Sequence, residues 1–305
     1  MKKIDVGGQA VIEGIMMRSP NYYAVATRNE EGKIITIHKK FKEKHPFLKI
    51  FFIRGIVNLI EMLVLGIKTL IWSADQQSEK PEEKLKKSEV FWTLALSMLF
   101  SIIFFVALPY FLTHIIGFVE EQRPVLFNVI DAVIKIAIFV IYIYSISLMK
   151  DVKKIFEYHG AEHKSIHCYE SGKELTVDNI KKFTTLHPRC GTSFIFIVFI
   201  FSIFIFSLVP LLMIRLNPDF NNLSFIVRKS ILFPLRILVI PIIAGFSYEL
   251  LKLSSKYKNN ILVKLITLPG ILFQKITTKE PDEKQLEVAI ISLKKVLDLE
   301  KQKTI

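Results

Sequence analysis

The sequence predicts a mainly α-helical polytopic membrane protein with a small N-terminal β unit, and three observations support this fold class. Hydrophobic residues make up 51% of the 305 positions, which is high for a soluble protein of this size. Four segments stay apolar over about 20 residues or more, the length that a helix needs to cross ~30 Å of hydrocarbon. Ahead of these segments, residues 1–46 have the mixed composition of a soluble unit.

Within the N-terminal unit, the pattern predicts a β-hairpin. Residues 23–28 and 33–38 are short runs rich in β-branched and aromatic residues, and the turn-forming segment Asn29-Glu30-Glu31-Gly32 joins them.

The four predicted spans contain few charges. Asp131 and Lys135 lie in the span at 125–149, and Arg236 lies in the span at 231–251. Glu249 lies near the cytoplasmic end of the latter span and is a candidate pocket residue that could reach the 150–190 loop. Charges inside a membrane indicate function by default, although Asp131 and Lys135 are one helical turn apart and can also pair structurally. The spans are residues 90–119, 125–149, 191–214 and 231–251.

A fifth apolar segment, residues 47–72, carries a polar stripe and can either span or lie in the membrane interface. If it does not cross, the N-terminal unit, the 75–89 linker, the 150–190 loop and the C-terminal region share one side. These parts hold 9, 4, 8 and 11 lysines and arginines, against four on the other side. The positive-inside rule therefore favours four spans with both termini in the cytoplasm.

This topology divides the chain into six parts. They are an N-terminal β unit (1–46), an amphipathic helix and linker (47–89), a first pair of spans (90–149), a cytoplasmic loop (150–190), a second pair of spans (191–251) and a cytoplasmic C-terminal region (252–305). In the last part, residues 261–273 form a short apolar segment that Pro269-Gly270 is expected to break, and an amphipathic helix follows Pro281.

The net charge of +13 predicts a polyanionic partner. In a membrane protein the anionic headgroups of the lipid bilayer account for this charge most simply. Contact with nucleic acid or the ribosome is the weaker alternative, because a basic surface binds either polyanion.

The 150–190 loop is rich in histidine and cysteine, the residue types that commonly bind metals. His159, His163 and His167 recur every four residues, which places them on one face of a helix. Cys168 follows them, and His187 and Cys190 stand where the next span begins. A reducing compartment keeps both thiols free to bind metal, so we expect a divalent metal, with zinc as the best match.

Glu162 is the candidate catalytic residue. His159-x-x-Glu162-His163 fits the inverted zincin pattern, in which a glutamate beside a metal-bound histidine activates water. Two other interpretations remain open: a closed structural zinc site with four protein ligands, or a polar belt of histidines that caps helices and contacts headgroups.

Four longer motifs resemble the YqhQ-like family of bacterial membrane proteins of unknown function. They are GGQAVIEGIMMR at 7–18, YHGAEHK at 158–164, HPRCGTS at 187–193 and TTKEPD at 277–282. Members of that family are described as predicted metal-dependent enzymes. The resemblance also implies a bacterial origin and a location in the cytoplasmic membrane. It also singles out Gln9, Glu13 and Arg18, either as part of the histidine pocket or as a Gly-rich turn of the β unit. Lys279 stands where the family pattern has Arg, and lysine offers only a point charge in place of a bidentate contact.

Three functions follow from these features. The first is a metal-dependent hydrolase at the cytoplasmic membrane face, acting on a membrane peptide or a lipid-linked substrate. The second is a non-enzymatic assembly or chaperone factor for membrane proteins, with a structural zinc site and a partner in the translocation machinery. The third is a transporter that uses Asp131, Lys135 and Arg236, and the small number of spans makes it the weakest.

Overall fold

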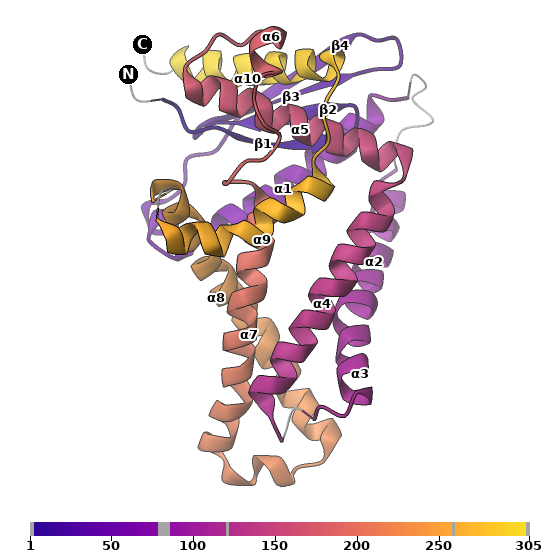
Figure 1. Ribbon diagram of the computed structural model, residues 1–305, viewed down its shortest axis with the longest axis vertical. Helices are drawn as coiled ribbons and strands as arrows, with labels where there is room; N and C mark the ends of the chain where they lie inside the picture. The colour runs from indigo at the N-terminus through magenta and orange to yellow at the C-terminus, as the bar shows by residue number, and fades with distance from the viewer. Residues whose placement is uncertain (1–2, 79–85, 120–121, 258–259, 303–305) are drawn as a thin grey trace.

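A computed structural model describes residues 3–78, 86–119, 122–257 and 260–302, and it consists of a sheet-and-helix layer at one end of a group of long apolar helices (Figure 1). The sheet is a four-stranded antiparallel meander in the order β1-β2-β3-β4. Its strands are β1 (Gly7–Val11), β2 (Gly14–Arg18), β3 (Tyr22–Arg28) and β4 (Ile34–Lys40).

The predicted hairpin is confirmed. β3 pairs with β4 from Tyr22↔Lys40 to Arg28↔Ile34. The turn between them closes at Gly32, whose φ of 80° lies in the left-handed region that glycine adopts without steric cost.

Alternating residues cover the two faces of the sheet with different helices. Ile15, Met17 and Ala24 pack into a core with α5 (Lys150–Ser171) and α10 (Glu283–Gln302). The intervening Met16 and Val25 pack instead on Leu65 of α1 (Ile53–Asp75). The side-chain alternation of a strand thus buries both faces of the sheet.

Five helical segments among the described residues are long and apolar enough to cross a membrane, so the chain is a membrane protein. Four of them match the predicted spans: residues 87–115, which include α2 (Lys87–Ile102) and α3 (Leu108–Ile115), then α4 (Pro124–Ser147), α7 (Gly191–Leu216) and α8 (Phe225–Lys256). The fifth is α1, which overlaps the 47–72 segment that the positive-inside rule predicts not to cross. Part of the predicted linker after α1, residues 79–85, lies outside the described residues.

The helix that carries the histidines is separate from the span that precedes it. α4 ends at Ser147, and Met149 has an extended backbone (φ −73°, ψ 136°) before α5 begins at Lys150. Most of the predicted 150–190 loop is therefore a separate helix, which lies crosswise to α4 on the sheet (Figure 1).

The expected break at Pro269-Gly270 is also wrong. α9 (Ile261–Thr277) runs through both residues as one helix. Gly270 lies against α7, where a Cβ would stand 2.3 Å from the Cα of Ser193, so the glycine serves close helix packing. The predicted amphipathic helix is confirmed as α10, whose apolar face, including Leu286 and Leu293, is buried against the sheet and α5.

Candidate metal centre

The centre is built on α5, whose face presents three histidines at intervals of one turn. The helix ends at Gly172, which adopts the left-handed conformation (φ 80°) common after a helix C-terminus. The ring centroids of His159 and His163 are 4.4 Å apart. The four-residue spacing thus brings the rings together as the sequence predicts.

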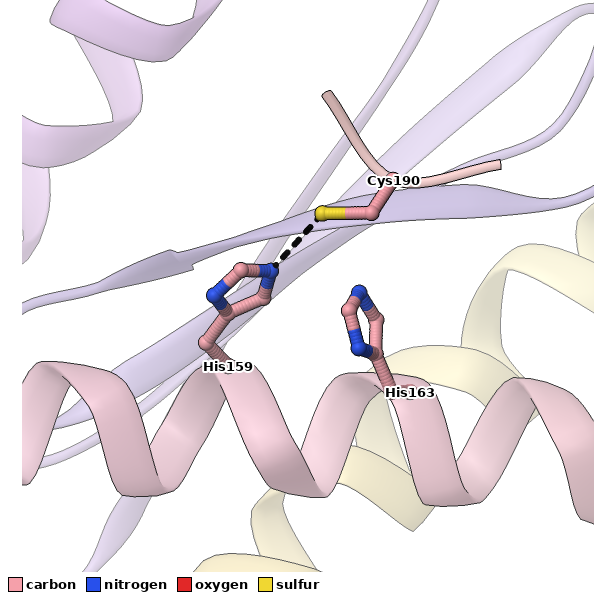
Figure 2. Close-up of side chains that lie close together, drawn as sticks. All are labelled: His159, His163 and Cys190. Carbon is pink, nitrogen blue, oxygen red and sulfur yellow. Dashed lines mark hydrogen bonds between the residues drawn. The ribbon is translucent and has the colours of Figure 1, made fainter. Parts of the chain in front are cut away.

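Cys190 completes a group of three ligand atoms with these histidines. One ligand atom each of His159, His163 and Cys190 lie within 4.8 Å of one another. The Nε2 of His159 lies 3.2 Å from the Sγ of Cys190, and Figure 2 shows the thiol reaching over the two rings from another segment. Cys190 is the N-cap residue of α7, directly before the first helical residue, Gly191.

Two backbone carbonyls orient the imidazoles. The Nδ1 of His159 lies 2.8 Å from the carbonyl oxygen of Thr277, and the Nδ1 of His163 lies 2.5 Å from that of Thr185. Because a carbonyl oxygen only accepts, each Nδ1 carries the proton and each Nε2 keeps its lone pair. This is how metal-binding histidines are held in their tautomer, and sequence reasoning did not identify either carbonyl.

The donor set fits zinc. Nitrogen and sulfur are the ligands that Zn²⁺ prefers, at about 2.0–2.3 Å, and three protein ligands leave a fourth tetrahedral position for water or substrate. His163 and Cys190 are buried, which shields the group from bulk solvent.

Glu162 lies beside this group and faces the sheet. Its carboxylate accepts a backbone hydrogen bond from Gly8 of β1, and a Cβ at Gly8 would stand 2.9 Å from its Cγ. Burial raises the pKa of Glu162 to about 7, opposed by the nearby imidazole of His159 and the Gly8 hydrogen bond. In the sequence, the role of Gly8 was indicated only by the Gly7-Gly8 pair of the N-terminal motif. The lack of a side chain at Gly8 lets the Glu162 carboxylate approach the backbone of β1.

A second group contains His167, Glu170 and His187, again with ligand atoms within 4.8 Å. Its chemistry is less suited to a metal, because Arg189 forms an ion pair with Glu170. The backbone N–H of Arg189 also donates to the Nδ1 of His187 (3.2 Å), which leaves the proton of a neutral ring on Nε2. That Nε2 lies 3.7 Å from the Oε2 of Glu170.

Desolvation governs the protonation of His187. Burial, aided by the neighbouring His167, His163 and Arg189, lowers its pKa to about 4 against the opposing effect of Glu170. Its backbone is held by the fully buried Gln274 of α9, which accepts from the His187 N–H (2.7 Å) and donates to its carbonyl (2.9 Å). His187 is therefore neutral at pH 7.

Sequence reasoning missed Glu170 and Gln274. Glu170 stands three residues after His167, so helical spacing contained a signal for it. Gln274 lies in an apolar run, and only its contact with His187 reveals its role.

Cys168 lies outside both groups. It is fully buried in the core between the sheet and α10, and its Sγ lies 3.4 Å from the carbonyl oxygen of Glu174. His167 donates from Nε2 to the carbonyl oxygen of Leu186 (2.8 Å). Both cysteines are free thiols.

Residues of the N-terminal motif at 7–18 contact two different helices, α5 and α1. Glu13 binds Lys154 (2.8 Å) of α5, and the hydroxyl of Tyr158 donates to it (3.3 Å), one residue before His159. Arg18 faces α1, where its guanidinium lies 3.8 Å from Glu61. Gln9 also faces α1, against Gly66.

The other predicted polar residues have partners away from the three-ligand group. Asp131 and Lys135 form an i,i+4 ion pair within α4. Glu249 accepts from the Nε of Arg54 (2.7 Å), and the guanidinium of Arg236 stands over the ring of Phe206 at 5.6 Å. None of the four belongs to either ligand group among the described residues.

Comparison with known proteins gives two matches. A sequence profile described as "Protein of unknown function (DUF1385)" matches residues 50–299. The chain is 35% identical over 317 residues to "Uncharacterized protein YqhQ" of Bacillus subtilis (strain 168), covering 96% of this chain and 92% of that protein. No solved structure matches. Neither description names an activity or a metal.

Proposed function

The chain belongs to the DUF1385 family, and from the geometry of its metal centre we propose that it is a zinc-dependent hydrolase of the bacterial cytoplasmic membrane. The substrate we propose is a membrane peptide or a lipid-linked molecule, cleaved at the cytoplasmic face. The single observation that carries the proposal is the convergence of His159, His163 and Cys190, with both Nδ1 atoms already engaged by carbonyls.

The three ligands come from different parts of the fold. Two come from α5 and one from the start of α7, and the carbonyl of Thr277 that orients His159 comes from the end of α9. Zinc held by His159, His163 and Cys190 would supply Lewis acidity for the activation of water and of a substrate carbonyl. The packing of three helices would hold the ligands in place without help from the metal.

Glu162 is our candidate for the general base. It is buried, its carboxylate lies near the imidazole of His159, and it accepts a hydrogen bond from the Gly8 N–H. A carboxyl group with a pKa near neutral pH both accepts and releases protons under working conditions. Its role would be to take a proton from water during attack and to return it to the leaving group.

The location of the centre fits a membrane-bound substrate. The sheet, α5 and α10 lie at one end of the apolar helices (Figure 1). The parts of the chain that contain them, residues 1–46, 150–190 and 252–305, hold 9, 8 and 11 of the lysines and arginines predicted to be cytoplasmic. We propose that this end, with both termini, is in the cytoplasm. The reducing conditions there would keep Cys190 available as a ligand.

Metal analysis of the purified protein tests the metal site. We expect about one zinc per chain, loss of that zinc in His159→Ala and Cys190→Ser, and retention in Cys168→Ser, the matched control for removing a buried thiol. After substitution with cobalt, a sulfur-to-cobalt charge-transfer band should be present in the natural sequence and in Cys168→Ser, and it should be absent from Cys190→Ser. Zinc retention in Cys190→Ser would overturn the proposed ligand set.

Acetohydroxamate, a small chelating probe, separates the hydrolase from the assembly factor with a structural zinc. If the fourth position is open, the probe shifts the visible spectrum of the cobalt protein, and Glu162→Gln keeps the metal while losing hydrolytic turnover. A spectrum that the probe leaves unchanged indicates four protein ligands. That result would refute the hydrolase and favour the assembly factor.

A further inference from the structure

α1 is long and apolar enough to span a membrane, but its second half is held on the sheet. Met62, Leu65 and Trp72 pack with the apolar residues of β1, β2 and β3, and the hydroxyl of Ser73 accepts from the N–H of Ile12 (3.0 Å). Only residues 53–61 precede these contacts. At 1.5 Å per residue they extend about 14 Å, less than half of the ~30 Å of hydrocarbon in a bilayer. α1 therefore cannot cross the membrane while the sheet stays outside it.

The face of α1 opposite the sheet is an exposed apolar stripe. Ile60, Leu63, Val64 and Ile67 are 56%, 58%, 46% and 39% exposed, and they recur with the spacing of a single helix face. The buried face has the small residues Gly66 and Thr69, among others, against the sheet. One face of α1 is thus packed on the sheet, and none of the described residues covers the apolar side chains on its other face.

α9 repeats this arrangement. Ile261, Leu265, Leu268 and Leu272 are 67%, 56%, 45% and 50% exposed at helical spacing. The opposite side is buried and packs on α7 and α4. In Figure 1 both α9 and α1 lie between the sheet and the long helices.

The charges of α9 match an anionic lipid surface. Lys264 and Lys275 are its charged residues, and both are exposed at one edge of the apolar stripe. Lysines in this position extend along apolar surface and place their ammonium groups among lipid phosphates.

We propose that the stripes of α1 and α9 lie in the headgroup-proximal part of one leaflet of the lipid bilayer. α1 is then a surface helix, and the chain crosses the bilayer four times. Continuity with the membrane-spanning part supports this occupant, because the first turn of α1 is tied to the end of α8 through Arg54 and Glu249.

One consequence concerns the metal centre. The packed side of α9 carries Thr277 and Gln274, which hold His159 and the backbone of His187. The helix therefore separates the ligand group from lipid by one helix diameter, about 10 Å.

Depth measurements in lipid test the proposal. Both native tryptophans, Trp72 and Trp92, are replaced by Phe, and a single tryptophan is introduced at Val64 or Leu268 in proteoliposomes of phosphatidylcholine and phosphatidylglycerol. The lipids carry bromine, a fluorescence quencher, either near the headgroup or near the chain end. Phe204→Trp, in the middle of α7 and 65% exposed, is the deep control, and Lys39→Trp in β4 is the water-exposed control.

We expect stronger quenching by the shallow bromine at positions 64 and 268, by the deep bromine at 204, and by neither at 39. Deep quenching at position 64 would mean that α1 spans, which overturns the proposal. Absence of quenching at 64 and 268 would mean that protein, such as a second copy of this chain, covers the stripes, which overturns it equally.

Discussion

His159 and Cys190 are 31 residues apart in the chain, yet the Nε2 of the histidine lies 3.2 Å from the Sγ of the cysteine. The contact joins the middle of α5 to the N-cap residue of α7. If the proposed metal binds at a site assembled from two helices, its binding and the tertiary packing are interdependent, and this relationship has measurable consequences.

Metal removal should destabilise the protein. A ligand that binds only the folded state contributes about 4 kcal/mol when its free concentration is 1,000 times Kd. We expect EDTA to lower the Tm of the detergent-solubilised protein and to have little effect on His163→Asn, which has already lost a ligand. His38→Asn, at an exposed position of β4, should respond like the natural sequence. Equal EDTA sensitivity of His163→Asn would argue against His163 as a ligand.

His187 should make the metal-free protein sensitive to acid. In the folded state the pKa of His187 is about 4, below its ordinary value of 6.5. Between pH 4 and pH 6.5 the folded state therefore binds fewer protons than the unfolded state. The stability it contributes is present above pH 6.5 and is lost as the pH falls towards 4. We expect unfolding free energies of His187→Gln to depend less on pH in this window. The same slope as the natural sequence would show that other groups govern acid sensitivity, and His38→Gln is the control.

Gly160→Ala should disrupt the support of the centre. A Cβ at this position would stand 2.0 Å from the carbonyl oxygen of Lys279, in the segment that directly follows Thr277. We expect a loss of about 1–3 kcal/mol, as for other overpacking changes, together with weaker zinc binding. The unfolding free energy and the zinc Kd are the measurements.

Gly191→Ala is the matched control, because a Cβ there meets nothing within 4 Å although the residue adjoins Cys190. It should be neutral or slightly stabilising, since alanine favours a helix more than glycine does. If both variants behave alike, the close approach of Lys279 to α5 has no energetic role.

Cysteine labelling should place both ends of α1 on the same side of the membrane. Glu43→Cys lies before α1 and Ser88→Cys lies at the start of α2, and both positions are exposed. We expect a membrane-impermeant maleimide to label them from the same side in oriented vesicles. Asp219→Cys, between α7 and α8, should be labelled from the opposite side. Labelling of positions 43 and 88 from opposite sides would make α1 a span.

Much of the architecture is local and was readable in the sequence. Long apolar segments predict the long helices, alternation around a Gly-containing turn predicts the β3–β4 hairpin, and the apolar pattern after Pro281 predicts α10. The four-residue spacing of His159 and His163 likewise predicts that their rings meet on one helix face. Each of these features depends on residues within a few turns of one another, where backbone geometry alone relates position to direction.

Tertiary packing decided the rest. Both cysteines were candidate ligands in the sequence, but the path of residues 172–190 brings Cys190 to the histidines, whereas Cys168 lies on another face of α5, buried in the core. The carbonyls of Thr185 and Thr277 have no side-chain signature, so their role is visible only when segments remote in sequence meet α5. Pro269-Gly270 reads as a break, yet packing on α7 keeps α9 continuous. The sequence by itself determined which residues could bind a metal, whereas the packing of α5, α7 and α9 determined which of them converge, because their separation depends on long-range contacts.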